Sequence, residues 1–302
     1  MNAKMIILTL LTLLIASMAI ATADVSLKQL EQSMAKSAGN ISSYTFSKST
    51  DSSAQYSNAS IEKKLEVFKT TAGNVDLRNE AAWWSSKMAT QKNGKALNWQ
   101  SYFVNGSAYL NVGKNWTKHT FNNTSRINSD FNIIPGEIAL IKNSDMSISG
   151  SEKVAGKDYY KLTGRPNDQV YKLIIGRQIL SALYASQIKL PEALRNKKVD
   201  LDKSALMNQS KIAITAWVSK DDSLLKRMDI NSSLTITPQI LNVSSTNFKI
   251  YTTLNESTIF DNFGSLVKIV LPKDAQNESS LLKGAAWSHA VLGSVNSMNK
   301  LV

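Results

Sequence analysis

Apolar and polar residues alternate with a period of two over much of this chain, most clearly around Asn105-Gly106. An Asn-Gly pair between alternating segments predicts a tight β-hairpin, because both turn positions need a positive φ. Counting outward from the turn pairs Val104 with Ser107 and Trp99 with Val112. One face of the hairpin then carries apolar side chains, namely Trp99, Phe103, Ala108, Leu110 and Val112. The opposite face carries Tyr102 and Tyr109, which we expect to point outward.

Other segments repeat the same alternation and predict a meander of antiparallel strands. The predicted strands cover residues 44–56, 61–71, 75–88, 116–121, 148–154, 158–163, 211–218, 228–236, 247–254 and 266–271. Turn residues separate them, as at Gly73-Asn74 and Asn93-Gly94. The apolar positions predict one continuous apolar sheet face, made by Leu65, Val67, Trp99, Phe103, Leu110, Val112, Ile212, Ile214, Val218, Met228, Ile230 and Leu234.

Four segments have helical features. Residues 25–38 begin with a capping box formed by Ser26 and Gln29, and residues 130–141 fit a short helix or a loop packed on the sheet. Asp168 is the predicted N-cap of the longest helix, whose apolar stripe consists of Val170, Leu173, Ile174, Leu180, Leu183 and Tyr184. This stripe is the natural cover for the apolar sheet face. Residues 279–295 fit an amphipathic tail helix.

The amino-terminal segment has the pattern of a secretory signal. Lys4 precedes the apolar run from Met5 to Ile20, and Ala21-Thr22-Ala23 fits a cleavage site. We therefore predict a signal peptide over residues 1–23, a single α+β domain over 24–275 and a tail over 276–302. An uncleaved segment would instead tether the protein to the membrane. The expected location is extracytoplasmic in either case, secreted or at the cell surface.

Composition narrows the class further. The 302 residues contain no cysteine, which excludes disulfides and a lipid anchor on cysteine, so core burial must supply the stability. Asn-x-Ser/Thr sequons are dense. The glycosylation candidates are Asn40, Asn58, Asn105, Asn115, Asn122, Asn208, Asn255 and Asn277. Three more sequons are at Asn123, Asn231 and Asn242. Export, sequons and absent cysteine together suggest a glycosylated archaeal cell-surface protein.

The formal net charge is +12, from 35 basic and 23 acidic residues. These basic residues are scattered, and the export signal argues against nucleic acid as a partner. An anionic envelope surface is a candidate partner instead.

The sequence contains few residues in patterns typical of a catalytic site. The chain has two histidines, His119 and His289, and its carboxylates show no spacing typical of an acid and base pair. No glycine-rich phosphate loop is present. We therefore predict no catalytic residues, no metal, no cofactor and no enzymatic activity.

The order of motifs resembles the lipoprotein-carrier superfamily over residues 26–273. The segments that carry the resemblance are "SLKQLEQSMAKSAGNISSYTF", "YFVNGSAYLNVGKNWTKH", "VAGKDYYKLTG", "ITAWVSKDDSLLKRMDI" and "TIFDNFGSLVKIVLPKDA". Within the superfamily, the chain is similar to exported lipoproteins and mycobacterial lipid-binding lipoproteins, although it lacks their anchoring cysteine. The resemblance implies an open half-barrel, a curved antiparallel sheet whose concave face is covered by helices and can hold an apolar ligand.

These observations predict an exported, non-enzymatic binding protein for a lipid or another apolar ligand. The candidate cavity residues are Trp99, Phe103, Leu110, Val112, Leu180, Leu183, Tyr184, Ile212, Ile214, Met228 and Ile230. The alternative is a glycosylated cell-surface structural or interaction module that binds no ligand. The two differ in whether the helices fill the concavity or leave a void of ligand size.

Overall fold

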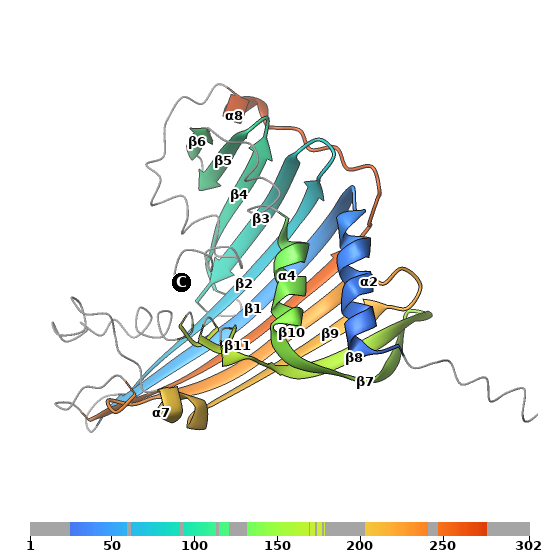
Figure 1. Ribbon diagram of the computed structural model, residues 1–302. Coiled ribbons are helices and arrows are strands. Elements are labelled where there is room, and N and C mark those ends of the chain that lie inside the picture. Colours follow the sequence, from blue (N-terminus) through green and yellow to red (C-terminus); the bar gives the residue numbers. More distant parts are fainter. Residues whose placement is uncertain are drawn as a thin grey trace, which may run out of the picture.

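The computed structural model describes residues 25–58, 62–90, 94–112, 115–120, 132–168, 170–172, 174–176, 178, 203–240 and 247–276. Within these ranges, eleven antiparallel strands form one sheet in the order β6-β5-β4-β3-β2-β1-β11-β10-β9-β8-β7. The strands are β1 (Ser43–Asn58), β2 (Glu62–Asp76), β3 (Ala81–Ala89), β4 (Ala96–Val104), β5 (Ser107–Val112), β6 (Asn115–Thr120), β7 (Ser144–Val154), β8 (Lys157–Pro166), β9 (Ser210–Ser219), β10 (Leu225–Ile236) and β11 (Phe248–Asp261). The sheet is curved and open (Figure 1). The predicted α+β half-barrel is confirmed.

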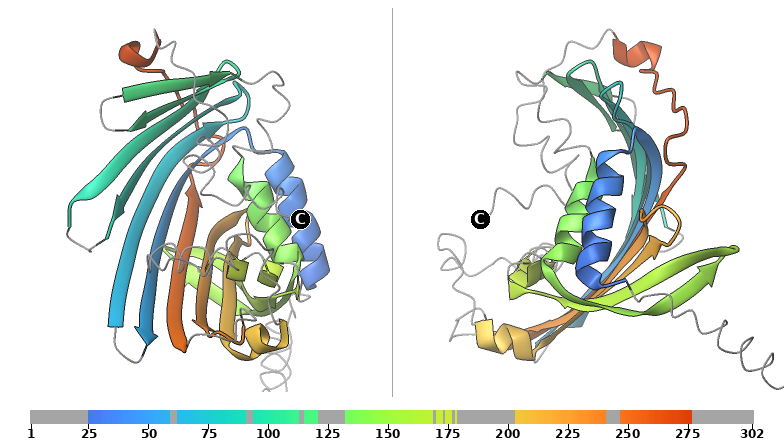
Figure 2. Two further views of the ribbon diagram at one scale, coloured as in Figure 1. Left: turned by 90° about the vertical axis from the view of Figure 1, so that its left-hand side faces the viewer. Right: turned by 45° about the vertical axis from the view of Figure 1, so that its right-hand side comes forward.

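Two helices, α2 (Leu27–Gly39) and α4 (Ile133–Lys142), lie side by side on the concave face of the sheet (Figure 2). The predicted capping box at the start of α2 is present, since Ser26 and Gln29 each bond the other's backbone. Two short helices, α7 (Lys203–Asn208) and α8 (Lys273–Gln276), lie near the margins of the sheet. None of the helices in the described ranges is long and apolar enough to cross a membrane.

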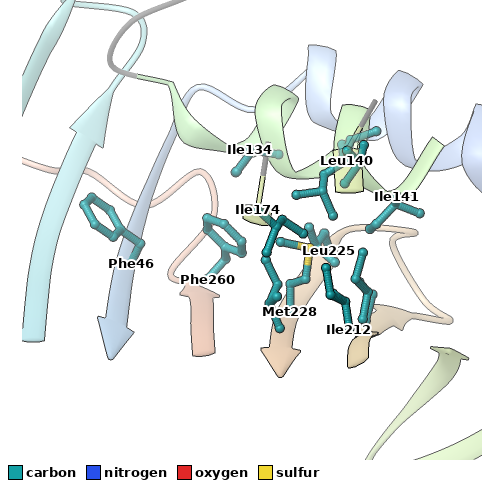
Figure 3. Close-up of a cluster of buried hydrophobic side chains, with 14 of the residues drawn as sticks. Phe46, Ile134, Leu140, Ile141, Ile174, Ile212, Leu225, Met228 and Phe260 are labelled. Atoms are coloured by element: carbon teal, nitrogen blue, oxygen red, sulfur yellow. The ribbon is translucent and has the colours of Figure 1, made fainter. Parts of the chain in front are cut away.

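The core lies between these helices and the sheet. Leu30 and Met34 of α2 are buried, as are Ile134, Ile138 and Ile141 of α4. They pack over apolar side chains of β1, β11, β10 and β9 (Figure 3). Burying each large apolar side chain contributes about 1.5–3 kcal/mol, so this layer fixes the helices on the sheet.

Part of the predicted long helix contributes to the same core. Residues 168, 170–172, 174–176 and 178 are helical, and Val170 and Ile174 are buried as predicted. The side chain that caps this helix is Asn167 and not Asp168, because the Asn167 Oδ1 accepts from the Val170 N–H at 3.1 Å. Gln178 then fastens the helix to the sheet. Its Oε1 accepts from the Ser232 hydroxyl at 2.5 Å, and its Nε2 donates to the Thr252 carbonyl at 3.1 Å.

The hairpin around Asn105-Gly106 has the predicted register. Val104 lies opposite Ser107, and Trp99 lies opposite Val112. Asn105 and Gly106 adopt φ values of 51° and 69°, as this turn requires.

The predicted turn at Gly73-Asn74 was wrong, since β2 runs straight through both residues to Asp76. The turn follows at residues 77–80, where the Asp76 carboxylate accepts from the backbone N–H groups of Arg78 and Asn79, both at 3.2 Å. Gly73 serves close packing. A Cβ there would lie 2.4 Å from the Trp83 carbonyl oxygen, so no other residue fits.

The predicted strand over 266–271 was also wrong. This segment has no regular secondary structure, and Leu266 and Val270 are exposed. It is anchored at its start, where the Gly264 N–H donates to the Ser43 carbonyl at 2.8 Å. The predicted signal peptide, Leu190-Pro191 and the tail helix over 279–295 lie outside the described residues.

Candidate functional site

The ligand-cavity candidates fall into three groups. Six of them, Phe103, Leu110, Ile212, Ile214, Met228 and Ile230, are buried in the core on the concave side. Trp99 is half-buried, and Val112 is 43% exposed. Leu180, Leu183 and Tyr184 lie outside the described residues. The sheet therefore brings the described candidates onto one face, but most of them already pack against protein.

An apolar surface continues beyond the helices on the concave side. We call it the apolar strip, and it consists of Leu65, Val67, Met88, Leu97, Trp99 and Val112. Met88 lies opposite Leu97, and Trp99 lies opposite Val112, so the strip is continuous across β3, β4 and β5. Leu97 is 50% exposed. Because Trp99 also packs against the buried core, the strip extends that core toward solvent.

Charged and polar side chains interrupt the concave face at its centre. This central polar band consists of Lys48, Thr50, Lys69, Glu256 and Thr258. The Lys48 Nζ lies 2.6 Å from the Glu256 Oε1, and the Thr50 hydroxyl lies 3.5 Å from the Glu256 Oε2. The band separates Ile230 on one side from Met88 on the other. The prediction of one continuous apolar face was therefore wrong, because β1 and β11, which have no apolar alternation at this level, form the middle of the sheet.

A buried tyrosine attaches α4 to the sheet at the edge of this face. The Tyr44 hydroxyl accepts from the Ile133 N–H and donates to the Asn132 Oδ1, both at 3.1 Å. It thereby takes the place of a side-chain cap, which Asn132 does not provide. Burial raises the pKa of Tyr44 well above its usual range. The backbone groups of Ile133 and Ile134 lower this pKa in part, and the negative charge of Glu137 on α4 adds a smaller increase.

A Tyr44→Phe variant should lose about 1–3 kcal/mol of unfolding free energy at pH 7, because the Ile133 N–H loses its partner. The raised pKa means that the unfolded chain releases this proton first, near pH 10. Stability from Tyr44 is therefore fully present below pH 10 and falls as the pH rises above it. Urea unfolding at pH 7–11 should show a shallower alkaline decline for Tyr44→Phe than for the wild type. Tyr251→Phe, at a 43% exposed position, is the control, and equal declines in both variants would contradict the assignment.

The convex face at β4–β6 is covered, which corrects the prediction that the tyrosine-bearing side looks outward to solvent. Tyr109 and Trp116 are 8% and 7% exposed and pack with Ala275 of α8. The Trp116 Nε1 donates to the Asp274 Oδ2 at 2.8 Å. Sequence periodicity assigned the correct face, but it contains no information about a covering segment that lies 158 residues further along the chain, as Asp274 does from Trp116.

Among the hollows lined by described residues, two border the sheet. One, of ≈ 820 Å³, lies among residues of β8–β11 with Tyr171 and Met207 on its wall. The other, of ≈ 570 Å³, lies between the convex side of β4 and the segment with Pro272 and Asp274. The wall of the first hollow is mainly apolar, although it includes Asn231 and Asn255, whereas polar groups form about half of the wall of the second. Sequence reasoning predicted neither hollow.

The sequons within the described residues are accessible. Asn40, Asn58, Asn105, Asn115, Asn208, Asn231 and Asn255 are all exposed, whereas Asn122, Asn123, Asn242 and Asn277 lie outside the described residues. Asn231 points to the convex side, opposite to its neighbour Ile230.

Metal-ligand side chains do not gather among the residues that the structure describes. Within the described ranges, no three of the histidines, aspartates and glutamates lie close enough together to hold a metal ion. The concave face instead combines an apolar surface with a few buried charges, which is chemistry suited to binding an amphiphilic molecule.

No protein-family model and no curated protein matches the sequence. Among solved structures, LprF from Mycobacterium bovis is similar, with 14% sequence identity, a TM-score of 0.38 and coverage of 81% of this chain and 96% of that chain. Lipoprotein LppX from Mycobacterium tuberculosis has 10% identity, a TM-score of 0.34 and coverage of 81% and 100%. A LolA-superfamily protein from Nitrosomonas europaea has 9% identity, a TM-score of 0.21 and coverage of 83% and 96%.

One of these similar structures is thus a member of the superfamily that the sequence resembles. All three TM-scores lie below 0.5, so the function proposed below rests on the residues of this chain.

Proposed function

We propose that this protein is an exported, non-enzymatic binding protein that holds a lipid or another apolar ligand against the concave face of its half-barrel. The apolar strip is the observation that carries the proposal. Met88, Leu97, Trp99 and Val112 lie side by side across β3–β5, and Leu97 and Val112 remain 50% and 43% exposed. Contiguous exposed apolar surface of this kind is typical of a binding site.

The position of the strip suits an elongated ligand. The helices α2 and α4 cover the concave side over β1, β11, β10 and β9, whereas the strip lies beyond them on β2–β5. Trp99 links the strip to the buried core, so a bound chain would extend the packed layer that the helices begin. Each methylene removed from water contributes about 0.8 kcal/mol, which favours ligands with long hydrocarbon chains.

Ligand uptake by the purified protein tests the proposal. The mature chain beginning at Asp24 is titrated with a fluorescent fatty acid, and native mass spectrometry measures any molecule that copurifies. We expect saturable binding and quenching of Trp99 fluorescence. A Trp99→Phe variant should lose this quenching but still bind the fatty acid. A folded protein with no bound mass and no uptake of fatty acid or phospholipid would contradict the proposal.

The second candidate function is a glycosylated cell-surface module without a ligand. It is favoured by the seven exposed sequons, which are spread over both ends and both faces of the sheet. Mapping of glycopeptides from the exported protein tests it independently. Glycans at several of these sites combined with no uptake would favour the surface module, whereas uptake would favour the carrier.

A further inference from the structure

Positive charge exceeds negative charge at the centre of the concave face. On the concave side of β1, β2 and β11, the charged side chains are Lys48, Lys63, Lys69 and Glu256. Glu256 pairs with Lys48, and the two side chains are only 11% and 13% exposed. The other buried carboxylate on this side is Glu137 of α4. Its negative charge raises the pKa of Tyr44, which lies four residues from Lys48 along β1. Lys63 is exposed near the start of β2, so the central positive charge lies on the half-buried Lys48 and Lys69. Charges partly withdrawn from water interact more strongly than surface charges, so these two lysines create a local attraction for anions.

Two of these lysines are neighbours. Lys48 lies opposite Thr71, and Lys69 lies opposite Thr50, so the lysines are diagonal partners across β1 and β2. Diagonal partners lie about 7–8 Å apart, and their β-carbons are somewhat closer. Because each ammonium sits on a flexible four-carbon stem, both can reach one anionic group placed between them.

Lys69 lies where the charge meets the apolar strip. Its Nζ is 5.4 Å from the centre of the Trp99 ring, and the next residue of the strip, Met88, lies directly opposite Lys69 on β3. A hydrocarbon chain on the strip would therefore bring its polar end to Lys69 and Lys48.

We propose that the concave face selects anionic amphiphiles, with the hydrocarbon chain on the apolar strip and a phosphate or carboxylate headgroup at Lys48 and Lys69. This inference rests on the function proposed above and specifies its ligand class. An ammonium partner for an anionic headgroup gives a charge-assisted hydrogen bond, which is about twice as strong as a neutral one.

Three matched probes test the selection. Monooleoylglycerol supplies the chain without charge, its phosphate ester supplies both, and glycerol 3-phosphate supplies the headgroup alone. We expect the wild-type protein to bind the phosphate ester about tenfold more tightly than monooleoylglycerol, and this preference should shrink as the salt concentration rises. Glycerol 3-phosphate should bind weakly, because it lacks the chain.

Variants locate the headgroup. Lys69→Met should reduce the preference for the phosphate ester about tenfold and leave the affinity for monooleoylglycerol unchanged. Lys48→Met is combined with Glu256→Gln, since Lys48→Met alone would bury an unpaired carboxylate. Lys87→Met is the control for Lys69→Met, because Lys87 is exposed on the convex side of β3 and its removal changes the net charge by the same amount.

The outcomes separate this inference from the proposed function. Equal wild-type affinity for monooleoylglycerol and its phosphate ester overturns the headgroup site but leaves the carrier intact. A preference that survives both lysine variants, or falls equally in Lys87→Met, also overturns it. Binding of glycerol 3-phosphate as tight as that of the ester would indicate a free-phosphate site in place of an amphiphile site. No binding of either oleoyl probe overturns the carrier itself.

Discussion

An Ile214→Asp variant is expected to lose about 4 kcal/mol or more of its unfolding free energy and to unfold or aggregate at 25 °C. Ile214 is fully buried on the concave side of β9, opposite Ile230. A carboxylate there would be taken out of water without a cation or hydrogen-bond donor, which is among the most costly single changes. The expected loss is comparable with the whole stability of many domains, about 5–15 kcal/mol. Urea unfolding followed by circular dichroism measures it.

Ala213→Asp is the matched control for this prediction. Ala213 precedes Ile214 on the same strand, but it is exposed on the convex side. An aspartate at this position stays hydrated and should cost less than about 1 kcal/mol. Similar losses in the two variants would show that β9 does not have the register described here.

The alternation along β9 illustrates what the sequence predicts well. Ile212, Ile214, Ala216 and Val218 recur with a period of two, and all four are buried on the concave side. The same local signal placed the hairpin at Asn105-Gly106 in its correct register, since two-residue turns determine their own pairing. Elements defined by short-range periodicity and turn chemistry were therefore predictable.

Features that depend on distant strands were not. The central polar band arises because β11, near the carboxyl end of the described chain, pairs with β1, which places Glu256 beside Lys48 although the two are about 200 residues apart. Glycine is common in turns, but position 73 requires a glycine because Trp83 and Trp84 of β3 pack against it. In both cases a nonlocal contact decided the outcome, and a single sequence carries no signal for such contacts.

This distinction matters for the site. Candidates chosen for strong alternation, such as Ile214 and Met228, are core residues, because alternation reports burial against protein as readily as burial against a ligand. The residues that remain accessible, Leu97 and Val112, lie at strand ends where the pattern is weaker. Leu97 was consequently absent from the candidates, although its exposure makes it a better probe of binding.

A Leu97→Asp, Val112→Asp double variant should therefore separate ligand binding from folding. Both positions are about half exposed on the concave face, at 50% and 43%, so the new carboxylates remain hydrated in the free protein and should together cost less than about 2 kcal/mol of unfolding free energy. A hydrocarbon chain bound on the apolar strip would have to displace water from the two new carboxylates, which is strongly unfavourable. Uptake should fall about tenfold or more.

Monooleoylglycerol is the probe for this measurement, because a neutral ligand excludes charge repulsion as the cause of lost binding. Val154→Asp is the matched control. Val154 is 46% exposed, but it lies on β7, at the opposite edge of the sheet from β4 and β5. Its variant gains the same kind of charge at a similar exposure, so its affinity should equal that of the wild type. If the double variant remains folded and binds monooleoylglycerol as tightly as Val154→Asp does, the ligand does not lie on the apolar strip, and the concave surface beyond the helices loses its assigned role.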